Sequence, residues 1–337
     1  MQTSRNLSID TLRLIASFEV IALHLNYEPL PSLVAAAIRL QARWAVPFFF
    51  IVGGYFLASR LSESQRTDVR PSIYRLIWIF VIWSLIFIPL VLYQSGAREV
   101  FRRLLFPSAV YIGEYFHLWF PSSMIFGYVI LLFIFHYRLE KWLPVLSIGI
   151  LIHIFLAGSY NQAFNIKFPF DFVIARHWVS IPSLALGVWL YRRGPLNRWL
   201  ALGLLVGGLG LQFVEAWILQ TRFDISAYDH EILLGTLPFA LGVASLGLSG
   251  IKCLELPMLS RWGKEYSLGI YLAHPLVTFV SIKIIGSLAP SIDHLAPWKI
   301  LFPFVILMAC IGLFAALQSW LPAVFRFLMG DHLKRID

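Results

Sequence analysis

The chain has 337 residues, of which 59% are hydrophobic and 13% charged, whereas an ordinary soluble domain has about 25% charged residues. This composition excludes a soluble globular enzyme, and 12 Trp, 13 Tyr and 28 Phe residues exclude a disordered chain. The basic residues behind the net charge of +9 lie in short segments between apolar runs. They therefore indicate membrane topology and contact with anionic lipid rather than with nucleic acid.

Apolar runs follow one another along the whole sequence. A bilayer core of about 30 Å needs about 20 mostly apolar residues in each spanning helix. We therefore expect an all-α, polytopic transmembrane bundle of about ten helices, formed by residues 1–337 as a single membrane-embedded domain with no separate soluble domain. The runs are 7–26, 44–61, 74–93, 117–136, 143–159, 177–191, 199–219, 232–250, 265–286 and 300–324.

The Lys and Arg residues are divided unequally between the two sides of this predicted bundle. The side that holds both termini carries 16 of them, and the opposite side carries 9. Basic segments are retained in the cytoplasm when membrane proteins insert. The sequence therefore predicts that both the N-terminus and the C-terminus are cytoplasmic.

The first predicted helix contains several ionisable side chains, each of which is costly in a membrane and therefore a functional candidate. Ten residues lie between Arg13 and His24, so the two share one helix face, about 16 Å apart along the axis. Asp10, three residues before Arg13, is expected to pair with it. Glu19 points about a third of a turn away from Arg13 and is expected to meet another helix.

The pairing of an arginine with a histidine on one face has a chemical use. An arginine holds a phosphate, carboxylate or carbonyl through several donors and stays charged. A histidine can take a proton from a hydroxyl, which is worth about 10² to 10⁴ in rate. We expect Arg13 and His24 to face an enclosed cavity. The alternative is that Arg13 extends to the membrane interface and His24 caps the outer end of the helix.

Three segments of the sequence match the motifs of one protein family. They are SIDTLR at 8–13, followed by His24, then VPFFFIVGGYFL at 46–57, and SLGIYLAHP at 267–275. With these segments the chain resembles the acyltransferase-3 family of bacterial integral-membrane O-acyltransferases, in which they are similar to the first helix, the second helix and a late helix. The three segments occur in the family's order in a chain of the family's usual size.

This resemblance implies an enzyme that transfers an acyl group, most often acetyl from cytoplasmic acetyl-CoA, to a hydroxyl of a cell-envelope carbohydrate. The acceptor would be an exopolysaccharide, an O-antigen or a lipid-linked glycan. The family's essential arginine and histidine correspond to Arg13 and His24. The resemblance further implies a bacterial cytoplasmic (inner) membrane location, and polysaccharide-assembly machinery or a second copy of the chain as partner.

Three residues outside the first helix are candidates for supporting roles. Tyr271 and His274 share a face of their helix with Ser267 and are candidates to line a passage for the thioester arm. The alternative for His274 is a core histidine beside a proline kink. His117 enters its helix from the same side as His24 and is a candidate to orient the acceptor or assist the base; the alternative is a residue of the interfacial aromatic belt. Tyr271 or Glu19 is a candidate to complete the hydrogen-bond network.

Arginines on the predicted cytoplasmic side are candidates to bind the phosphates of CoA, an anionic ligand available only on that face. The alternative for each of them is a role in topology and lipid contact. On the outer side, Arg39 and Arg43 are candidates to face an acceptor glycan or anionic lipid. The candidates for CoA are Arg60, Arg66, Arg70, Arg75, Arg192 and Arg193.

Other motifs add no further function. No group of His, Cys and carboxylate residues has the spacing of metal ligands, so no metal is expected. The sequence has neither a phosphate-binding P-loop nor a dinucleotide fingerprint. Gly203 and Gly207 form a pair of small residues four apart, which predicts close packing of their helix against a neighbour.

A second class of function fits the same features. Ten helices, an intramembrane ion pair and a histidine near the middle of the membrane are also typical of a proton-coupled transporter of a polar solute. A transporter is expected to show inverted internal symmetry, which is not evident in this sequence. A scaffold in a polysaccharide export complex is a third class, but it leaves the intramembrane charges unexplained.

Overall fold

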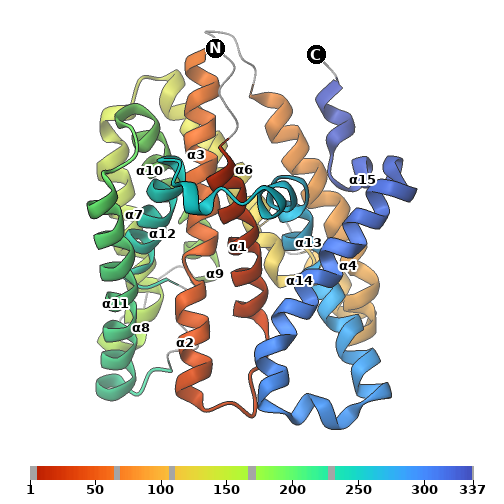
Figure 1. The fold of residues 1–337 in the computed structure, drawn as a ribbon. Helices are drawn as coiled ribbons and strands as arrows, with labels where there is room; N and C mark the ends of the chain where they lie inside the picture. Colours follow the sequence, from red (N-terminus) through yellow and green to blue (C-terminus); the bar gives the residue numbers. More distant parts are fainter. Residues whose placement is uncertain (1–5, 64–68, 106–110, 166–171, 227–231, 336–337) are drawn as a thin grey trace.

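The computed structural model describes residues 6–63, 69–105, 111–165, 172–226 and 232–335, and all regular elements in these ranges are helical (Figure 1). This confirms the predicted all-α bundle. The α-helices are α1 (Leu7–His24), α2 (Ser32–Ala42), α3 (Ala45–Glu63), α4 (Arg70–Leu105), α6 (Trp119–His136), α7 (Leu143–Ala157), α8 (Ser159–Phe164), α9 (Phe172–His177), α10 (Ser180–Arg193), α11 (Arg198–Phe223), α12 (Thr236–Leu248), α13 (Pro257–Leu288), α14 (Ala296–Trp320) and α15 (Pro322–Leu328). The short 3-10 helices are η1 (Phe116–Leu118), η2 (Glu140–Trp142), η4 (Lys252–Leu254), η5 (Pro290–His294) and η6 (Asp331–Arg335).

Each of the ten predicted apolar runs overlaps one of these helices. In the described part of the chain, seven helical segments are long and apolar enough to cross a membrane. The other three runs correspond to α1, which carries Asp10, Arg13 and Glu19, and to α10 and α12, which have only 14 and 13 residues. The chain is therefore a multi-pass membrane protein in which the buried helix α1 carries three charged residues.

Helix α1 lies inside the bundle. Twelve of its 18 residues are buried, and it packs against α2, α3, α12, α13 and α14. Its most extensive contact is with α13, where a Cβ atom on Gly263 would lie 1.8 Å from the backbone oxygen of Asp10. Only a glycine permits this close approach of two backbones. The charged residues of α1 are consequently surrounded by other helices.

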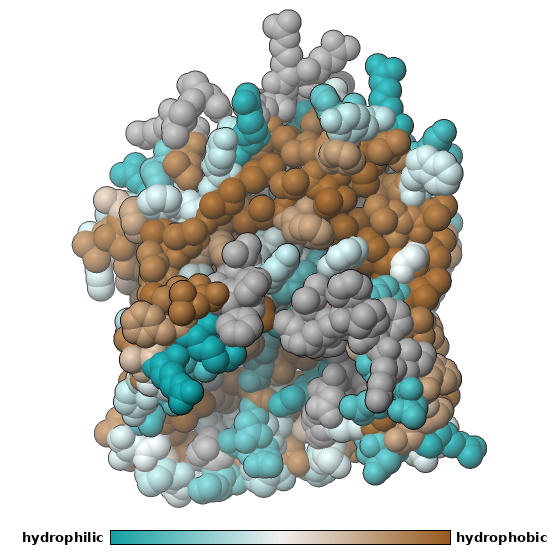
Figure 2. Space-filling view, turned by 180° about the vertical axis from the view of Figure 1, so that it is seen from behind, coloured by the Kyte–Doolittle hydropathy of each residue, from teal (hydrophilic) through white to brown (hydrophobic). Residues whose placement is uncertain are grey.

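The outer surface of the bundle is apolar. Figure 2 shows a broad band of hydrophobic residues across one face, with hydrophilic residues gathered toward its upper and lower ends. Large apolar side chains are exposed along several peripheral helices, where lipid chains can cover them. Examples are Val81 and Leu85 on α4, Ile148 and Ile152 on α7, Val206 and Val214 on α11, and Phe304 and Met308 on α14.

The start of α1 and the helix η6 lie at the same end of the bundle (Figure 1). The segment around η6 is bound to the beginning of α4. Arg75 Nε donates a hydrogen bond to the backbone oxygen of Met329 at 2.9 Å, and Arg75 Nη2 lies 3.1 Å from Asp331 Oδ1. Helix α2 and the connection from α13 to α14 lie at the opposite end.

Glycines allow two further helix pairs to pack closely. A Cβ atom on Gly187 of α10 would lie 1.9 Å from the backbone oxygen of Ile51 on α3. In α11, a Cβ atom on Gly208 would lie 2.4 Å from the backbone nitrogen of Phe239 on α12. The expected close packing of α11 is therefore present, but it is made by Gly208. The predicted pair, Gly203 and Gly207, has open space where side chains would be.

We expect Gly187→Ala to destabilise the protein by about 1–3 kcal/mol, because the added methyl group overlaps the backbone of α3. Thermal unfolding in detergent, followed by fluorescence-detected gel filtration, measures the change. Gly203→Ala is the matched control, since its methyl group meets open space and alanine favours a helix. A melting temperature of Gly187→Ala equal to that of Gly203→Ala would contradict the close packing of α10 on α3.

Candidate active site

His24 is the last residue of α1, and its ring is oriented by the helix itself. The Nδ1 atom lies 2.7 Å from the backbone oxygen of Val20. Because a carbonyl oxygen only accepts, Nδ1 carries the proton and donates it, which leaves Nε2 of the neutral ring as an acceptor. The ring thus caps the end of α1, as the alternative interpretation expected. The same bond leaves the other nitrogen available for chemistry.

Two cavities meet at His24. The larger has a volume of about 330 Å³ and is lined by residues of α1, α2, α3, α6, α9 and α13, among them Trp119 and Tyr271, and by Arg43 directly after α2. The smaller has a volume of about 200 Å³ and includes His274 in its wall. His24 and Phe116 line both cavities, and the side chain of His24 is exposed. The larger cavity has the size of a small-molecule site, about 300–1,000 Å³.

Three histidines from distant parts of the sequence come together here. The ring centroids of His24 on α1 and His274 on α13 are 5.3 Å apart. Those of His117 on η1 and His274 are 5.4 Å apart. The structure therefore places the candidate His274 beside His24, and the candidate His117 beside His274. Among the described residues, no group of three or more His, Cys, Asp or Glu residues could hold a metal ion.

Backbone carbonyls also fix the tautomers of the two other rings. His117 Nε2 donates to the oxygen of Leu272 at 3.0 Å, and His274 Nδ1 donates to the oxygen of Tyr271 at 2.7 Å. The remaining atoms, His117 Nδ1 and His274 Nε2, are buried and have no hydrogen-bond partner in the described part of the chain. Buried polar atoms without a partner are costly. His274 lines the smaller cavity, and an unpartnered polar atom beside a cavity is typical of a site that receives a polar ligand.

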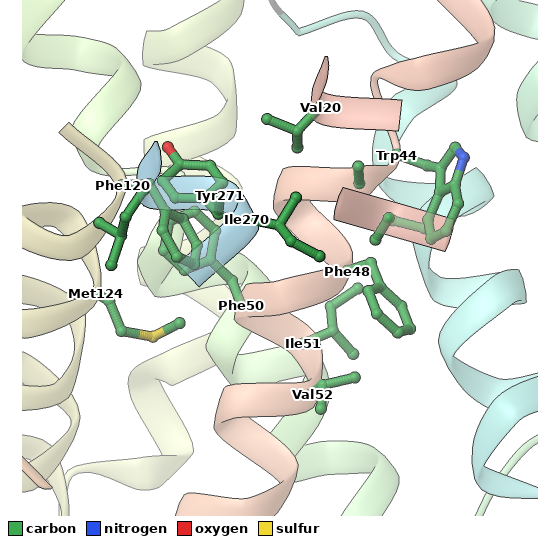
Figure 3. Packing of buried hydrophobic residues seen from close by; sticks show 14 of the residues in the cluster. Val20, Trp44, Phe48, Phe50, Ile51, Val52, Phe120, Met124, Ile270 and Tyr271 are labelled. Carbon is green, nitrogen blue, oxygen red and sulfur yellow. The ribbon is translucent and has the colours of Figure 1, made fainter. Parts of the chain in front are cut away.

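Tyr271 connects this histidine group to the core. Its Oη atom donates a hydrogen bond to the backbone oxygen of His117 at 2.5 Å. Its ring packs against Phe120, with centroids 4.9 Å apart, and Figure 3 shows Tyr271, Phe120 and Phe50 in one aromatic group. Tyr271 therefore holds η1 against α13 and also forms part of the wall of the larger cavity.

Arg13 lies at the other end of α1. As predicted, it pairs with Asp10, with 3.1 Å between Nη1 and Oδ1, and its guanidinium group lies over the ring of Phe56. It lines neither cavity at His24. On the face between Arg13 and His24, Ser17 and Val20 are fully buried, and Ser17 Oγ donates to the oxygen of Ser267 on α13. The expected cavity shared by Arg13 and His24 is thus replaced by helix packing along this face.

Glu19 faces α2 rather than the histidines. Gln41 Nε2 donates a hydrogen bond to Glu19 Oε2 at 2.6 Å, and the carboxylate is buried. This confirms the expectation that Glu19 meets another helix. Its contact connects α1 to α2, which carries Arg39 near its end and is followed directly by Arg43.

The arginines predicted for the CoA phosphates have different surroundings. Arg66 lies outside the described residues. Arg75 is engaged by Asp331, and Arg192 lies 3.9 Å from Glu140 and over the ring of Phe135. The others are exposed at the end of the bundle where α1 begins, namely Arg60, Arg70 and Arg193.

Tyr128 on α6 contacts α3, the helix that carries Arg60. Its Oη donates a hydrogen bond to the backbone oxygen of Gly53 at 3.4 Å. The sequence did not predict this contact, because Tyr128 is one of many aromatic residues in an apolar run.

Arg176, for which the sequence predicted no role, lines the larger cavity together with Arg39 and Arg43. Its guanidinium group lies over the ring of Trp119. The available signal was its place on the same predicted side of the membrane as Arg39 and Arg43. The structure thus surrounds His24 with histidines on one side and with arginines on the other.

Comparison with known proteins gives one match over nearly the whole chain. A family described as an acyltransferase domain matches residues 6–321. An amino-acid racemase of Enterococcus faecalis is 33% identical over 126 residues, which are 35% of this chain and 18% of that protein. A serine/alanine racemase of Enterococcus gallinarum is 28% identical over 135 residues, or 38% of this chain and 19% of that protein. The matched segments thus span about a fifth of these relatives, and no solved structure matches.

We expect Tyr271→Phe to lower the free energy of unfolding by about 1–3 kcal/mol, because the buried oxygen of His117 loses its donor. Chemical or thermal unfolding in detergent measures the effect. Tyr74→Phe serves as control, since Tyr74 is 59% exposed. Equal stability of the two variants would show that the bond to His117 does not hold η1 in place.

Proposed function

The chain belongs to the acyltransferase-3 family and is a membrane acyltransferase, and on this premise we propose its donor and acceptor. The donor is acyl-CoA, with acetyl-CoA as the preferred form. The acceptor is a hydroxyl of a cell-envelope carbohydrate, such as an exopolysaccharide, an O-antigen or a lipid-linked glycan. The site of action is the bacterial cytoplasmic membrane, with both termini in the cytoplasm.

The orientation of His24 carries this proposal. His24 donates Nδ1–H to the oxygen of Val20, so the neutral ring can accept a proton only at Nε2, and the ring lies in the wall of two cavities. A general base needs an oriented ring, an available nitrogen and room for the hydroxyl. His24 meets all three requirements.

In the proposed reaction, Nε2 of His24 takes the proton of the acceptor hydroxyl while its oxygen attacks the thioester carbonyl. The new C–O bond forms, the C–S bond breaks, and CoA leaves as a thiolate. The proton held by His24 then passes to the thiolate, which regenerates the base. His274 presents an unpartnered nitrogen beside this ring, and His117 presents another beside His274; both orient the groups around the base.

The donor binds, in this proposal, at the opposite end of α1. Arg13 orients it, and exposed arginines at the same end, such as Arg60, bind its phosphates. Because Ser17 and Val20 fill the face between Arg13 and His24, the acyl arm reaches His24 along another side of α1 or after a displacement of α13. The supporting partners are membrane lipid and polysaccharide-assembly machinery or a second copy of the chain.

The racemase names of the partial relatives are not carried over to this chain. The matched segments are only 18–19% of the two racemases. The activity in their names therefore cannot be assigned to the matched part. A proton-coupled transporter is the rival proposal, and it predicts solute flux in sealed vesicles without release of CoA. Acyl transfer and solute flux therefore distinguish the two functions directly.

We expect His24→Gln to reduce acyl transfer at least about 100-fold, because glutamine cannot accept the hydroxyl proton. The assay measures CoA release and the transfer of radiolabelled acetyl from acetyl-CoA by the purified protein. The acceptors in the assay are envelope carbohydrates extracted from the bacterium that produces the protein. His136→Gln is the control, since His136 is exposed near the other end of the bundle. Activity retained in His24→Gln would remove His24 as the base, and absence of any transfer by the wild type would favour the transporter.

We expect Arg13→Gln and His24→Gln to affect different kinetic constants. Loss of a guanidinium group that binds the donor raises KM for acetyl-CoA at least about tenfold, whereas loss of the base lowers kcat. Initial rates at varied acetyl-CoA concentration measure both constants. If Arg13→Gln lowers only kcat, Arg13 acts on the reacting atoms or on the structure rather than on donor binding.

A further inference from the structure

The smaller cavity at His24 combines aromatic rings with neutral polar groups. It is lined by residues of α4 and α13, by the end of α1 and by the segment that contains η1. The rings of Phe116 and Phe279 provide apolar surface, and His24, His274 and Thr278 provide polar atoms. Such a wall can contact both the C–H face and the hydroxyl groups of a sugar ring.

A proline in α13 fixes the direction of the His274 ring. Pro275 lies inside this helix and has no backbone N–H, so it cannot donate to the oxygen of Tyr271 four residues earlier. His274 Nδ1 donates to this oxygen instead, at 2.7 Å. The neutral ring therefore has an acceptor at Nε2. This atom is buried and has no hydrogen-bond partner among the described residues, and only 1% of His274 is exposed.

Thr278 adds a second polar atom without a partner to the same wall. It follows His274 by four residues, so the two share a face of α13. A threonine inside a helix can donate to the backbone oxygen four residues earlier, as Thr221 on α11 does to Trp217 at 2.8 Å. Thr278 Oγ1 is buried and, within the described part of the chain, makes no hydrogen bond at all. Because unpaired buried polar atoms are costly, a ligand that bonds to both residues is stabilised by removing this cost.

The two histidines at this cavity restrict the kind of group that can bind between them. His24 Nε2 and His274 Nε2 are both acceptors, and the ring centroids are 5.3 Å apart. A carboxylate or a carbonyl offers only acceptors, to which neither nitrogen can bond. A hydroxyl can donate to a histidine and accept from Thr278 at the same time. Two hydroxyls on neighbouring carbons of a sugar therefore match this wall, one at each histidine.

We propose that the smaller cavity binds the acceptor at a vicinal diol, in which one hydroxyl is acylated and its neighbour is bound unchanged. This inference rests on the proposed function and narrows its acceptor to carbohydrates with free hydroxyls on two adjacent carbons. The hydroxyl to be acylated donates to His24 Nε2. The neighbouring hydroxyl donates to His274 Nε2 and accepts from Thr278 Oγ1. His274 and Thr278 are therefore positioning residues, and together with His24 they form the diol site.

The binding test compares small cyclic alcohols, with the full chain in phosphatidylcholine nanodiscs. The probes are cis- and trans-cyclohexane-1,2-diol, cyclohexanol, and 2-methoxycyclohexanol, whose second oxygen accepts but cannot donate. Saturation-transfer NMR titrations without acetyl-CoA, corrected with empty nanodiscs, measure the affinities. We expect at least one diol to bind about tenfold more tightly than both monoalcohols, because only a second hydroxyl can donate to His274 Nε2. If neither diol binds more tightly than the monoalcohols, the inference is wrong.

Variants assign the diol preference to this cavity. Thr278→Val and His274→Asn are each expected to reduce it about tenfold, whereas Thr278→Ser keeps it. The asparagine amide can still donate to the oxygen of Tyr271 but lacks the distal acceptor. Thr221→Val is the matched control, since Thr221 is exposed and lines neither cavity at His24.

Stability separates positioning from a structural role. Because Thr278 Oγ1 has no partner in the described part of the chain, Thr278→Val should leave the melting temperature unchanged or raise it. A diol preference that persists in Thr278→Val or in a folded His274→Asn would overturn the inference. Loss of the preference in Thr278→Ser as well would show that the hydroxyl is not the cause, with the same consequence. Thr278→Val remains decisive if His274→Asn does not fold.

Binding and transfer are measured separately, so the diol site and the acyl transfer can fail independently. A diol preference in binding, without transfer by the wild type to any probe or to envelope carbohydrates, would support the diol site and overturn the proposed function. Transfer of radiolabelled acetyl to cyclohexanol and to the diols with equal KM would support the proposed function and overturn the diol site. When both hold, Thr278→Val raises KM for the diol about tenfold and leaves KM for acetyl-CoA and kcat unchanged. A decrease in kcat alone would overturn the positioning role of Thr278.

Discussion

The packing of α1 against α13 positions every histidine of the site. Gly263 permits the backbones of the two helices to approach closely, beginning at Asp10, and Ser17 joins α1 to Ser267 by a hydrogen bond about two turns further on. This contact brings the end of α1 beside the middle of α13, so that His24 lies next to His274. Since α13 also accepts the hydrogen bond from His117, the same contact positions η1.

The same packing separates the surroundings of Arg13, at one end of α1, from those of His24 at the other end. A fully apolar helix in this place would be simpler to bury, because ionisable groups inside a membrane are costly. Here the cost is reduced by local partners, Asp10 for Arg13 and Gln41 for Glu19. The buried residues between Arg13 and His24 keep the two ends of α1 apart in this conformation. In the reaction that we propose, the acyl group therefore reaches His24 by a route other than the face that Arg13 and His24 share.

The larger cavity combines groups of different chemical character. His24 contributes a proton acceptor, the aromatic rings of Phe116 and Trp119 contribute apolar surface, and the arginines contribute fixed positive charge. Each type comes from a different part of the chain, and the cavity exists only where these parts meet. Such convergence of a few polar groups in an otherwise apolar pocket is typical of ligand sites.

Composition and residue order were enough to predict the all-α membrane bundle, the ion pair of Arg13 with Asp10, and the shared face of Arg13 and His24. These features depend on hydropathy and on the geometry of a single helix, which the order of residues contains directly. Only the folded bundle shows which residues meet His24, that Gly208 rather than Gly203 packs against α12, and that Arg176 joins the cavity. Such contacts depend on how helices distant in sequence are rotated and shifted against one another, and the periodicity of each helix does not specify this.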